Sequence, residues 1–204
     1  MKKFSLVIAL VLLFGAGGWW WYKSQPAGTA ESAGHITHNA LKGAPKVGDL
    51  APTFVTTGAL AGKAFELDLA EQLKKGPIVL YFFPKAFTSG CTAEAHEFAE
   101  READFAKLGA SVIGMSADGQ EQLAKFSKEA CRDKFPVAQA TPDIMQAYGV
   151  KLPVMDMTNR TSFVIAQDGK IQFIHSDMDY KDHVKLTYEA VQKMKAVTAD
   201  TPKA

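Results

Sequence analysis

Residues 77–91, PIVLYFFPKAFTSGC, join a continuous apolar run to a turn that ends in a cysteine. The run 77–83 is rich in β-forming residues, as expected of a strand that is buried on both faces. A helical pattern follows over 92–108, with Gly109 as a suitable C-terminal stop. Cys91 therefore lies between the carboxyl end of a central strand and a helix N-terminus, which is where sites form in open α/β sheets.

The chain from Val47 onward alternates strand and helix patterns in the same way. An Asp-Gly pair suits a hairpin turn, and Thr141-Pro142 is a typical helix start. This alternation, with two antiparallel hairpins, predicts an α/β fold in which a central mixed β-sheet is flanked by helices on both faces. The expected elements are a hairpin in 47–68, a short helix in 69–76, a strand in 111–117, a helix in 118–135, a short strand in 135–140, a helix opening at 141, a hairpin in 161–176 and a closing helix in 182–197.

The composition of the 204-residue chain is that of an ordinary globular protein, with 47% hydrophobic and 22% charged residues. The formal net charge is +1, and no run rich in Lys or Arg appears after the first three residues. Neither feature favours binding to a polyanion, so we expect no nucleic-acid partner.

Residues 4–22, FSLVIALVLLFGAGGWWWY, carry no charge and end in four aromatic residues. Their length approaches the roughly 20 residues with which a helix crosses a bilayer, and aromatic side chains favour its interface. Lys2 and Lys3 bias the first residues to the cytoplasmic side. We therefore expect residues 1–22 to anchor the protein in the inner membrane, with the domain on the periplasmic, extracytoplasmic side. A cleaved signal segment, which would release the domain into the periplasm, is the alternative.

Residues 23–46 are rich in Ala, Gly, Ser, Thr and Pro and lack apolar periodicity, which predicts a flexible linker. The folded domain is then expected over 47–199, with a tail at 200–204. His35 and His38 have a spacing that could reach one metal ion, but a metal site needs more ligands than two. We interpret both as solvated linker residues.

The position of Cys91 suits a reactive thiol as well as a packed one. A thiol reacts as its thiolate, and a helix N-terminus stabilises that anion. Thr88 offers a hydroxyl three residues earlier, and Pro84 removes a backbone donor and fixes the strand exit. Free cysteines are also among the most buried residue types. Position alone therefore leaves open a packed core cysteine, half of a structural disulfide and a nucleophile.

The spacing of Pro84, Thr88 and Cys91 matches the Pro-x-x-x-Thr-x-x-Cys active-site motif of peroxiredoxins. The wider stretch YFFPKAFTSGCTAEAHEF resembles the PrxQ branch, also called bacterioferritin comigratory proteins, of the alkyl hydroperoxide reductase/thiol-specific antioxidant superfamily. The resemblance covers residues 47–197 and implies a thioredoxin-like fold.

The resemblance also implies a role for each matching residue. Cys91 would be the peroxidatic cysteine, whose thiolate attacks the O–O bond, while Thr88 would hydrogen-bond the thiolate and the peroxide. Pro84 would shelter the pocket. Arg160, within NRTSFVIAQDGKI, would favour the thiolate and stabilise charge on the leaving oxygen, and Glu94 would orient that arginine. A surface ion pair for Arg160 and a first-turn partner of the helix dipole for Glu94 are the alternatives.

A second thiol is expected to resolve the sulfenic acid that such a reaction forms. Many PrxQ proteins place this cysteine five residues after the first, where this chain has His96, but others carry it in a later helix. Cys131 is therefore the candidate resolving cysteine. On a helix over 118–135 it falls beside the apolar stripe, so we expect a reachable thiol on the helix flank. A stray free cysteine is the alternative.

Formation of the disulfide would require movement, because the two Cα atoms must come within about 7 Å of each other. We expect residues 90–95 to unwind on oxidation. Phe87 makes the pocket mouth apolar, which suggests organic hydroperoxides as substrates beside hydrogen peroxide. His96 remains open as a packing residue, a proton shuttle or a surface residue.

These expectations combine into a thiol-dependent peroxidase that reduces hydrogen peroxide and/or organic hydroperoxides through a sulfenic acid and a Cys91–Cys131 disulfide. A thioredoxin-like or other dithiol donor would regenerate it, and no cofactor or metal is expected. One alternative is an extracytoplasmic thiol–disulfide oxidoreductase, against which the lack of a Cys-x-x-Cys motif counts. The other is a tethered copper-binding module that uses Cys91, His96 and the linker histidines, and it lacks closely spaced soft ligands.

Overall fold

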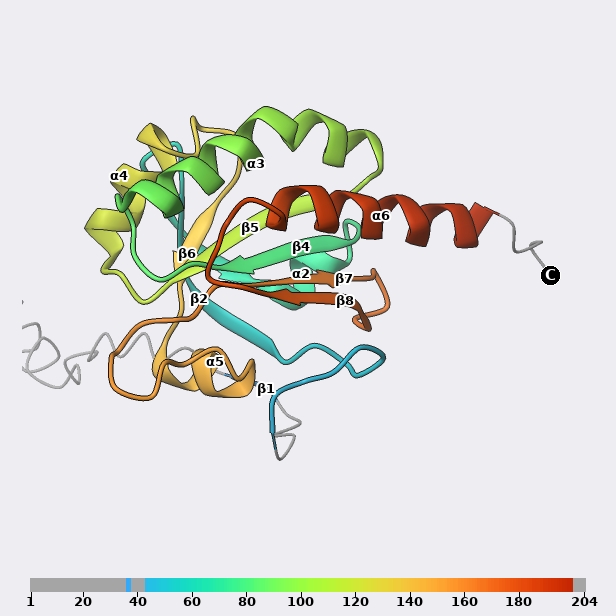
Figure 1. Ribbon diagram of the computed structural model, residues 1–204, viewed down its shortest axis with the longest axis horizontal. Helices are drawn as coiled ribbons and strands as arrows, with labels where there is room; N and C mark the ends of the chain where they lie inside the picture. Colours follow the sequence, from blue (N-terminus) through green and yellow to red (C-terminus); the bar gives the residue numbers. More distant parts are fainter. Residues whose placement is uncertain (1–35, 38–42, 200–204) are drawn as a thin grey trace, which may run out of the picture. The chain divides into compact units, whose positions relative to one another are not determined.

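The computed structural model describes residues 36–37 and 43–199 (Figure 1). Most of the expected linker, the segment 1–22 and the tail 200–204 lie outside the described residues. The strands form a mixed sheet in the order β1-β2-β6-β5-β4-β7-β8, and β3 pairs with β2. The neighbours of β4 are parallel β5 and antiparallel β7. The predicted mixed sheet and thioredoxin-like α/β fold are confirmed.

The elements have the following bounds, in chain order: β1 Ile36–Thr37, β2 Thr53–Leu60, β3 Lys63–Asp68, α2 Leu69–Leu73, β4 Ile78–Phe82, α3 Ser89–Lys107, β5 Ser111–Ser116, α4 Gln120–Glu129, β6 Val137–Gln139, α5 Pro142–Ala147, β7 Thr161–Ile165, β8 Ile171–Ser176 and α6 His183–Ala199.

Alternate side chains of the central strand β4 enter two separate apolar cores. Val79 and Tyr81 pack in one cluster with residues of α3, α4 and α6. Leu80 and Phe82 pack in the other with residues of α2 and α5. Figure 1 shows α3, α4 and α6 on one side of the sheet and α5 on the other. The continuous apolar run in the sequence is thus explained by burial on both faces.

Local sequence signals explain several element boundaries. The Thr141 side chain accepts a hydrogen bond from the backbone N–H of Ile144 at 3.3 Å, and Pro142 occupies the first turn of α5. Gly169 takes a φ of 85° in the turn between β7 and β8, as the Asp-Gly pair predicts. The two predicted hairpins, β2–β3 and β7–β8, are both present.

Two helices have boundaries that differ from those predicted. Helix α3 begins at Ser89 rather than residue 92, so Cys91 is the third residue of its first turn. Helix α4 ends at Glu129, because Arg132 and Asp133 adopt φ values of 51° and 59° and turn the chain away from the helical path. Cys131 therefore lies in a turn after the helix.

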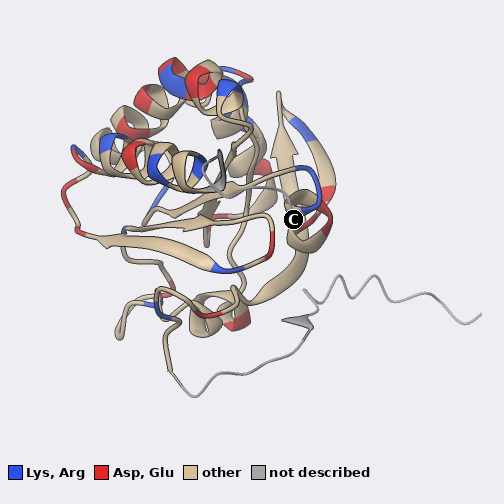
Figure 2. Ribbon diagram, turned by 90° about the vertical axis from the view of Figure 1, so that its right-hand side faces the viewer, with Lys and Arg blue, Asp and Glu red and all other residues tan. Residues whose placement is uncertain are grey.

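The helices that face solvent carry mixed charge. Figure 2 shows Lys and Arg alternating with Asp and Glu along their outer sides. Within residues 36–37 and 43–199, no helix combines the length and apolar character that crossing a membrane requires.

Candidate active site

The sulfur of Cys91 lies at the N-terminus of α3, within the core. Thr88 is the N-cap residue of this helix, so the first-turn N–H groups around Cys91 have no intrahelical partner. The Cys91 side chain is only 1% exposed. Its Sγ accepts a hydrogen bond from Nη2 of Arg160 at 3.4 Å. A helix N-terminus and a guanidinium both stabilise a thiolate, so the sulfur occupies a place suited to its anionic form.

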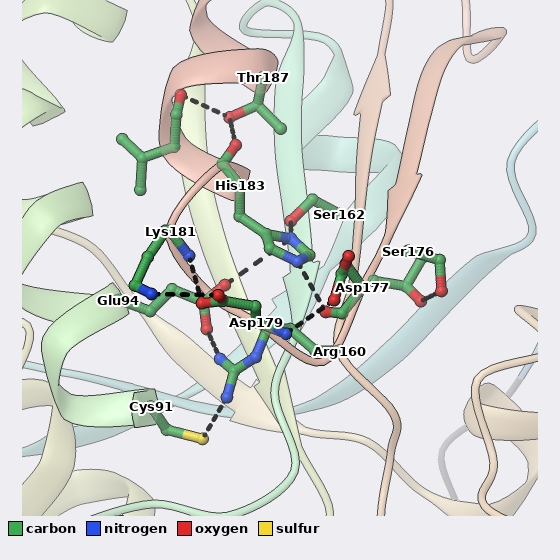
Figure 3. A network of polar contacts seen from close by, with 12 residues as sticks. Cys91, Glu94, Arg160, Ser162, Ser176, Asp177, Asp179, Lys181, His183 and Thr187 are labelled. Atoms are coloured by element: carbon green, nitrogen blue, oxygen red, sulfur yellow. Dashed lines mark hydrogen bonds and ion pairs between the residues drawn. The ribbon is translucent and has the colours of Figure 1, made fainter. Parts of the chain in front are cut away.

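Arg160 directly precedes β7 and is held by contacts to two segments, helix α3 and the loop after β8 (Figure 3). Its Nη1 donates to Oε2 of Glu94 in α3, and its Nε donates to the carbonyl oxygen of Met178 at 3.0 Å. Nη2 is left to face the sulfur of Cys91. The side chain is 5% exposed. A buried, fixed guanidinium of this kind is a preorganised donor for charge that develops beside the sulfur.

Glu94 lies three residues after Cys91, on the same face of α3, and is fully buried. Burial raises the pKa of this carboxyl group to about 8, and the Arg160 guanidinium acts in the opposite direction. Its second oxygen, Oε1, lies 3.8 Å from Nδ1 of His183 and has no hydrogen-bond partner within the described part of the chain. The contact that the resemblance implied between Glu94 and Arg160 is therefore present, and neither residue forms a surface ion pair.

The turn that connects β4 to α3 is fixed by side chains of the neighbouring segment. The backbone N–H of Ala86 donates to Oδ2 of Asp118 at 2.7 Å. Pro84 is half-buried at the start of this turn. Thr88 is exposed, and its hydroxyl donates to the carbonyl oxygen of Lys85 at 3.0 Å. Among the described residues Thr88 has no hydrogen bond to Cys91, so its predicted contact with the thiolate is not seen in this state.

Phe87 adopts a φ of 65°, an uncommon conformation for an aromatic residue, in the turn that precedes Thr88. Its side chain is 43% exposed. The ring meets that of Phe126 edge-on, with centroids 5.2 Å apart. The residue thus presents an apolar, partly exposed ring close to the N-terminus of α3.

Cys131 is a buried thiol, and the prediction that it lies exposed on a helix flank is wrong. Its side chain is 0% exposed and belongs to the same apolar cluster as Cys91. The turn after α4 directs it inward, since the N–H of Cys131 still bonds to the carbonyl oxygen of Phe126 while the chain reverses. Burial raises the pKa of the Cys131 thiol. Both cysteines are free.

Three further groups around the site have no signature in the sequence. These are the Met178 carbonyl, the buried Ser162 hydroxyl and the buried side chain of His183. In the sequence, His183 is simply a histidine at the start of the last helical pattern, and nothing there indicates its partners. His96, which the sequence singled out, is half-buried on α3. No group of three or more His, Cys, Asp or Glu side chains within residues 36–37 and 43–199 is arranged to bind a metal ion, and His35 and His38 lie outside this part.

Comparison with known sequences matches residues 47–174 to the AhpC/TSA family. The chain is 28% identical over 144 residues to peroxiredoxin Bcp of Escherichia coli, a match that covers 68% of this chain and 90% of that protein. It is 33% identical over 127 residues to peroxiredoxin Bcp of Bacillus subtilis, covering 58% of this chain and 77% of that protein.

The expected location, an inner-membrane anchor with a periplasmic domain or release into the periplasm, is wrong. The match takes up 90% of the Escherichia coli Bcp protein, which leaves little length for an additional anchor and linker. The helices of the described residues include none that could span a membrane. Residues 4–22, on which the prediction and the expected membrane contact were based, lie outside the described residues.

Comparison with solved structures points to peroxiredoxins, as the sequence matches do. The crystal structure of peroxidoxin BcpB from Mycobacterium tuberculosis superposes with a TM-score of 0.66 at 30% identity and covers 73% of this chain and 97% of that one. A thioredoxin peroxidase from Plasmodium yoelii, at 17% identity and a TM-score of 0.68, shares the fold. The chain therefore belongs to the AhpC/TSA family, as a PrxQ/Bcp-like peroxiredoxin and hence an enzyme of the thioredoxin-dependent peroxidase type.

Proposed function

We propose that residues 47–199 reduce hydrogen peroxide and organic hydroperoxides through a thiolate at Cys91. The observation that carries this assignment is the 3.4 Å contact between Arg160 Nη2 and Cys91 Sγ at the N-terminus of α3. Among the described residues this sulfur alone combines a helix N-terminus with a fixed cation.

In the first step the Cys91 thiolate attacks one peroxide oxygen and the O–O bond breaks. An S–O bond forms, and the leaving oxygen departs as water or an alcohol after it takes up a proton. Cys91 is oxidised to the sulfenic acid, and the peroxide is reduced. Arg160 stabilises the negative charge on the leaving oxygen, and Glu94 together with the Met178 carbonyl keeps the guanidinium in place.

In the second step the thiol of Cys131 attacks the sulfenic sulfur, the S–S bond forms and water leaves. Both cysteines are buried in the same apolar cluster, and Cys91 lies in the first turn of α3. We expect the backbone around them to rearrange so that the two Cα atoms come within bonding range. Residues 90–95 are proposed to unwind for this purpose. A thioredoxin-like dithiol then reduces the disulfide by exchange, and two thiols are restored.

Peroxide consumption by wild type, Cys91→Ser and Cys131→Ser tests the proposal. We expect no turnover without Cys91, and a single turnover followed by arrest without Cys131. Mass spectrometry after one equivalent of peroxide should find a Cys91–Cys131 disulfide in wild type and a sulfenic acid in Cys131→Ser. Full activity of Cys91→Ser would refute the proposal, and disulfide exchange without any peroxide consumption would favour the oxidoreductase alternative.

A further inference from the structure

The loop 177–182 between β8 and α6, here called the β8–α6 loop, forms part of the wall around the site. Its Met178 carbonyl accepts the hydrogen bond from Arg160 Nε at 3.0 Å. The loop also lies against the first turn of α3: a Cβ atom on Gly90 would lie 3.5 Å from Arg160 Nη2 and 3.6 Å from the ring of Tyr180. A shift of this loop would therefore move the guanidinium that faces Cys91.

A buried imidazole holds the β8–α6 loop in place. Nε2 of His183 lies 2.9 Å from the carbonyl oxygen of Asp177, and Nδ1 lies 2.8 Å from the hydroxyl oxygen of Ser162. A carbonyl oxygen only accepts, so Nε2 carries the hydrogen and donates it to Asp177. In the neutral ring Nδ1 then accepts from the Ser162 hydroxyl. Burial lowers the pKa of His183 to about 4, which agrees with a neutral ring.

The hydrogen bonds of His183 to Ser162 and Asp177 form a contact chain that leads at both ends to Arg160. Asp177 and Met178 are consecutive, so one carbonyl is held by His183 and the next one holds Arg160. Ser162 lies in β7, two residues after Arg160. The imidazole thus connects β7, which Arg160 directly precedes, to the loop that accepts the Nε hydrogen bond of Arg160, as Figure 3 shows.

We propose that His183 is a positioning residue for the peroxidase reaction, acting through its Nε2–Asp177 hydrogen bond to hold the Met178 carbonyl against Arg160. The inference rests on the proposed role of Cys91. Loss of the bond frees the loop, the guanidinium becomes less well ordered, and the Cys91 thiolate loses part of its stabilisation.

Two amide substitutions separate the two hydrogen bonds of the ring. The side-chain nitrogen of Gln reaches the place of Nε2, so His183→Gln keeps a donor for Asp177. The amide of Asn reaches only the place of Nδ1. His183→Asn therefore keeps the contact to Ser162 and loses the hydrogen bond to the Asp177 carbonyl in the β8–α6 loop. His183→Leu fills the same space without either bond. His175→Asn is the matched control, because His175 contacts the His183 ring at a centroid distance of 4.5 Å and lies outside the contact chain to Arg160.

The readouts are the rate of Cys91 alkylation by iodoacetamide at pH 7, followed by mass spectrometry of its peptide, and kcat/KM for hydrogen peroxide. We expect both to fall about tenfold in His183→Asn and in His183→Leu, the effect of losing one hydrogen bond that supports a charged group. His183→Gln should restore most of the rate, and His175→Asn should match wild type.

Equal rates in wild type and His183→Asn would overturn the proposal, as would an equal loss in the Gln and Asn variants. If the Asn variant does not fold, His183→Leu against His183→Gln gives the same comparison. Alkylation needs no peroxide. If wild type consumes no peroxide but Cys91 is still alkylated more slowly in His183→Asn than in wild type, the proposed function is refuted. The effect of His183 on the Cys91 thiolate then stands by itself.

Discussion

The three nitrogens of the Arg160 guanidinium have three different partners, and this division of contacts is what places the cation. Nη1 faces Glu94, Nε faces the Met178 carbonyl and Nη2 faces Cys91. A lysine could supply the charge but not the planar fork with fixed directions. The chemistry of the site therefore depends on the arginine side chain itself and on both of its anchors.

Phe87 is expected to favour peroxides with an organic substituent. Its ring is 43% exposed in the turn before α3, where it can cover apolar substrate surface. Phe87→Asp should lower kcat/KM for cumene hydroperoxide about tenfold while hydrogen peroxide changes less, since an aromatic side chain contributes about 1.5–3 kcal/mol when its apolar surface is buried. The measurement is the ratio of the two kcat/KM values in both proteins. An unchanged ratio would show that Phe87 does not select the substrate.

Cys131 should react slowly with thiol reagents in the reduced protein. Both cysteines are buried, but Nη2 of Arg160 faces the sulfur of Cys91, whereas burial raises the pKa of the Cys131 thiol. Alkylation requires the thiolate, so we expect iodoacetamide to label Cys131 at least about tenfold more slowly than Cys91. Timed labelling followed by peptide mass spectrometry measures both rates. In urea the two rates should converge, and faster labelling of Cys131 in the native protein would contradict the described burial.

The sequence could predict the reacting residues but not the groups that position them. Pro84, Thr88 and Cys91 belong to one short motif, and Glu94 follows within one helical turn. A backbone carbonyl such as that of Met178 has no sequence signature, because every residue carries one. The partners of His183 could not be predicted either, since they come from another strand and from a loop whose path depends on the folded chain.

The turn after α4 is the element that differs most from the prediction, and Cys131 lies within it. Arg132 and Asp133 both lie in the left-handed region, which costs about 1–2 kcal/mol per residue for L-amino acids. The turn is retained by hydrogen bonds from Asp133 N–H to the Ser127 carbonyl at 3.1 Å and from Lys134 N–H to the Cys131 carbonyl at 2.9 Å. The conformational cost reduces the free energy needed to open this turn and release the thiol.

Oxidation should loosen two elements at once, the first turn of α3 and the turn after α4. In the proposed mechanism the first turn of α3 unwinds and the turn after α4 opens to bring Cys91 and Cys131 together, so the backbone hydrogen bonds around them break. We expect amide hydrogen exchange in 90–95 and 130–134 to speed up at least about tenfold on oxidation, while β4 exchange stays unchanged. The measurement compares reduced and peroxide-treated protein by mass spectrometry.

Cys131→Ser is the matched control for this exchange experiment, because it forms the sulfenic acid but no disulfide. It should keep slow exchange in both segments after one equivalent of peroxide. Unchanged exchange in oxidised wild type would refute the proposed unwinding.

Element types were predictable where the residue pattern was strong. The apolar run of β4 and the Asp-Gly hairpin were assigned correctly, because burial on two faces and turn chemistry act locally. The end of α4 was not, because the helical pattern of 118–135 continues past Glu129 and the left-handed turn is imposed by packing. The inward direction of Cys131 follows from that turn.

At the scale of the whole domain, the site exists only when distant parts of the chain are folded together. Cys91 and Arg160 are 69 residues apart, and β4 and β7 must pair before they approach each other. The same pairing brings His183 between β7 and the β8–α6 loop. Global stability and active-site geometry therefore share some of their contacts.

The pH dependence of stability should contain a contribution from His183. The pKa of this residue is lowered from 6.5 to about 4 in the folded protein, so the unfolded chain binds an extra proton between these pH values. The contribution is complete above pH 6.5 and is lost as the pH falls toward 4. Between pH 7 and 5 the free energy of unfolding should fall by about 1–2 kcal/mol more in wild type than in His183→Gln.

Urea denaturation of both reduced proteins at pH 5, 6 and 7 measures this difference. Glu94, whose pKa is raised by burial, lies with Oε1 3.8 Å from His183 Nδ1, so the comparison reports the contribution of His183 together with its effect on Glu94. An identical loss of stability in wild type and His183→Gln would show that His183 is not held neutral by the fold.

The burial of Cys131 also bears on the competition between two reactions of the oxidised enzyme, disulfide formation and further oxidation by peroxide. In the proposed mechanism the sulfenic acid on Cys91 persists until the turn after α4 opens and the buried Cys131 reaches it. During that interval a second peroxide molecule can convert it to the sulfinic acid, which a thiol no longer resolves. On this mechanism, the opening rate of one small turn would set the peroxide concentration above which the enzyme inactivates itself. Below that concentration the protein acts as a recyclable scavenger, and above it each molecule is consumed by its own substrate.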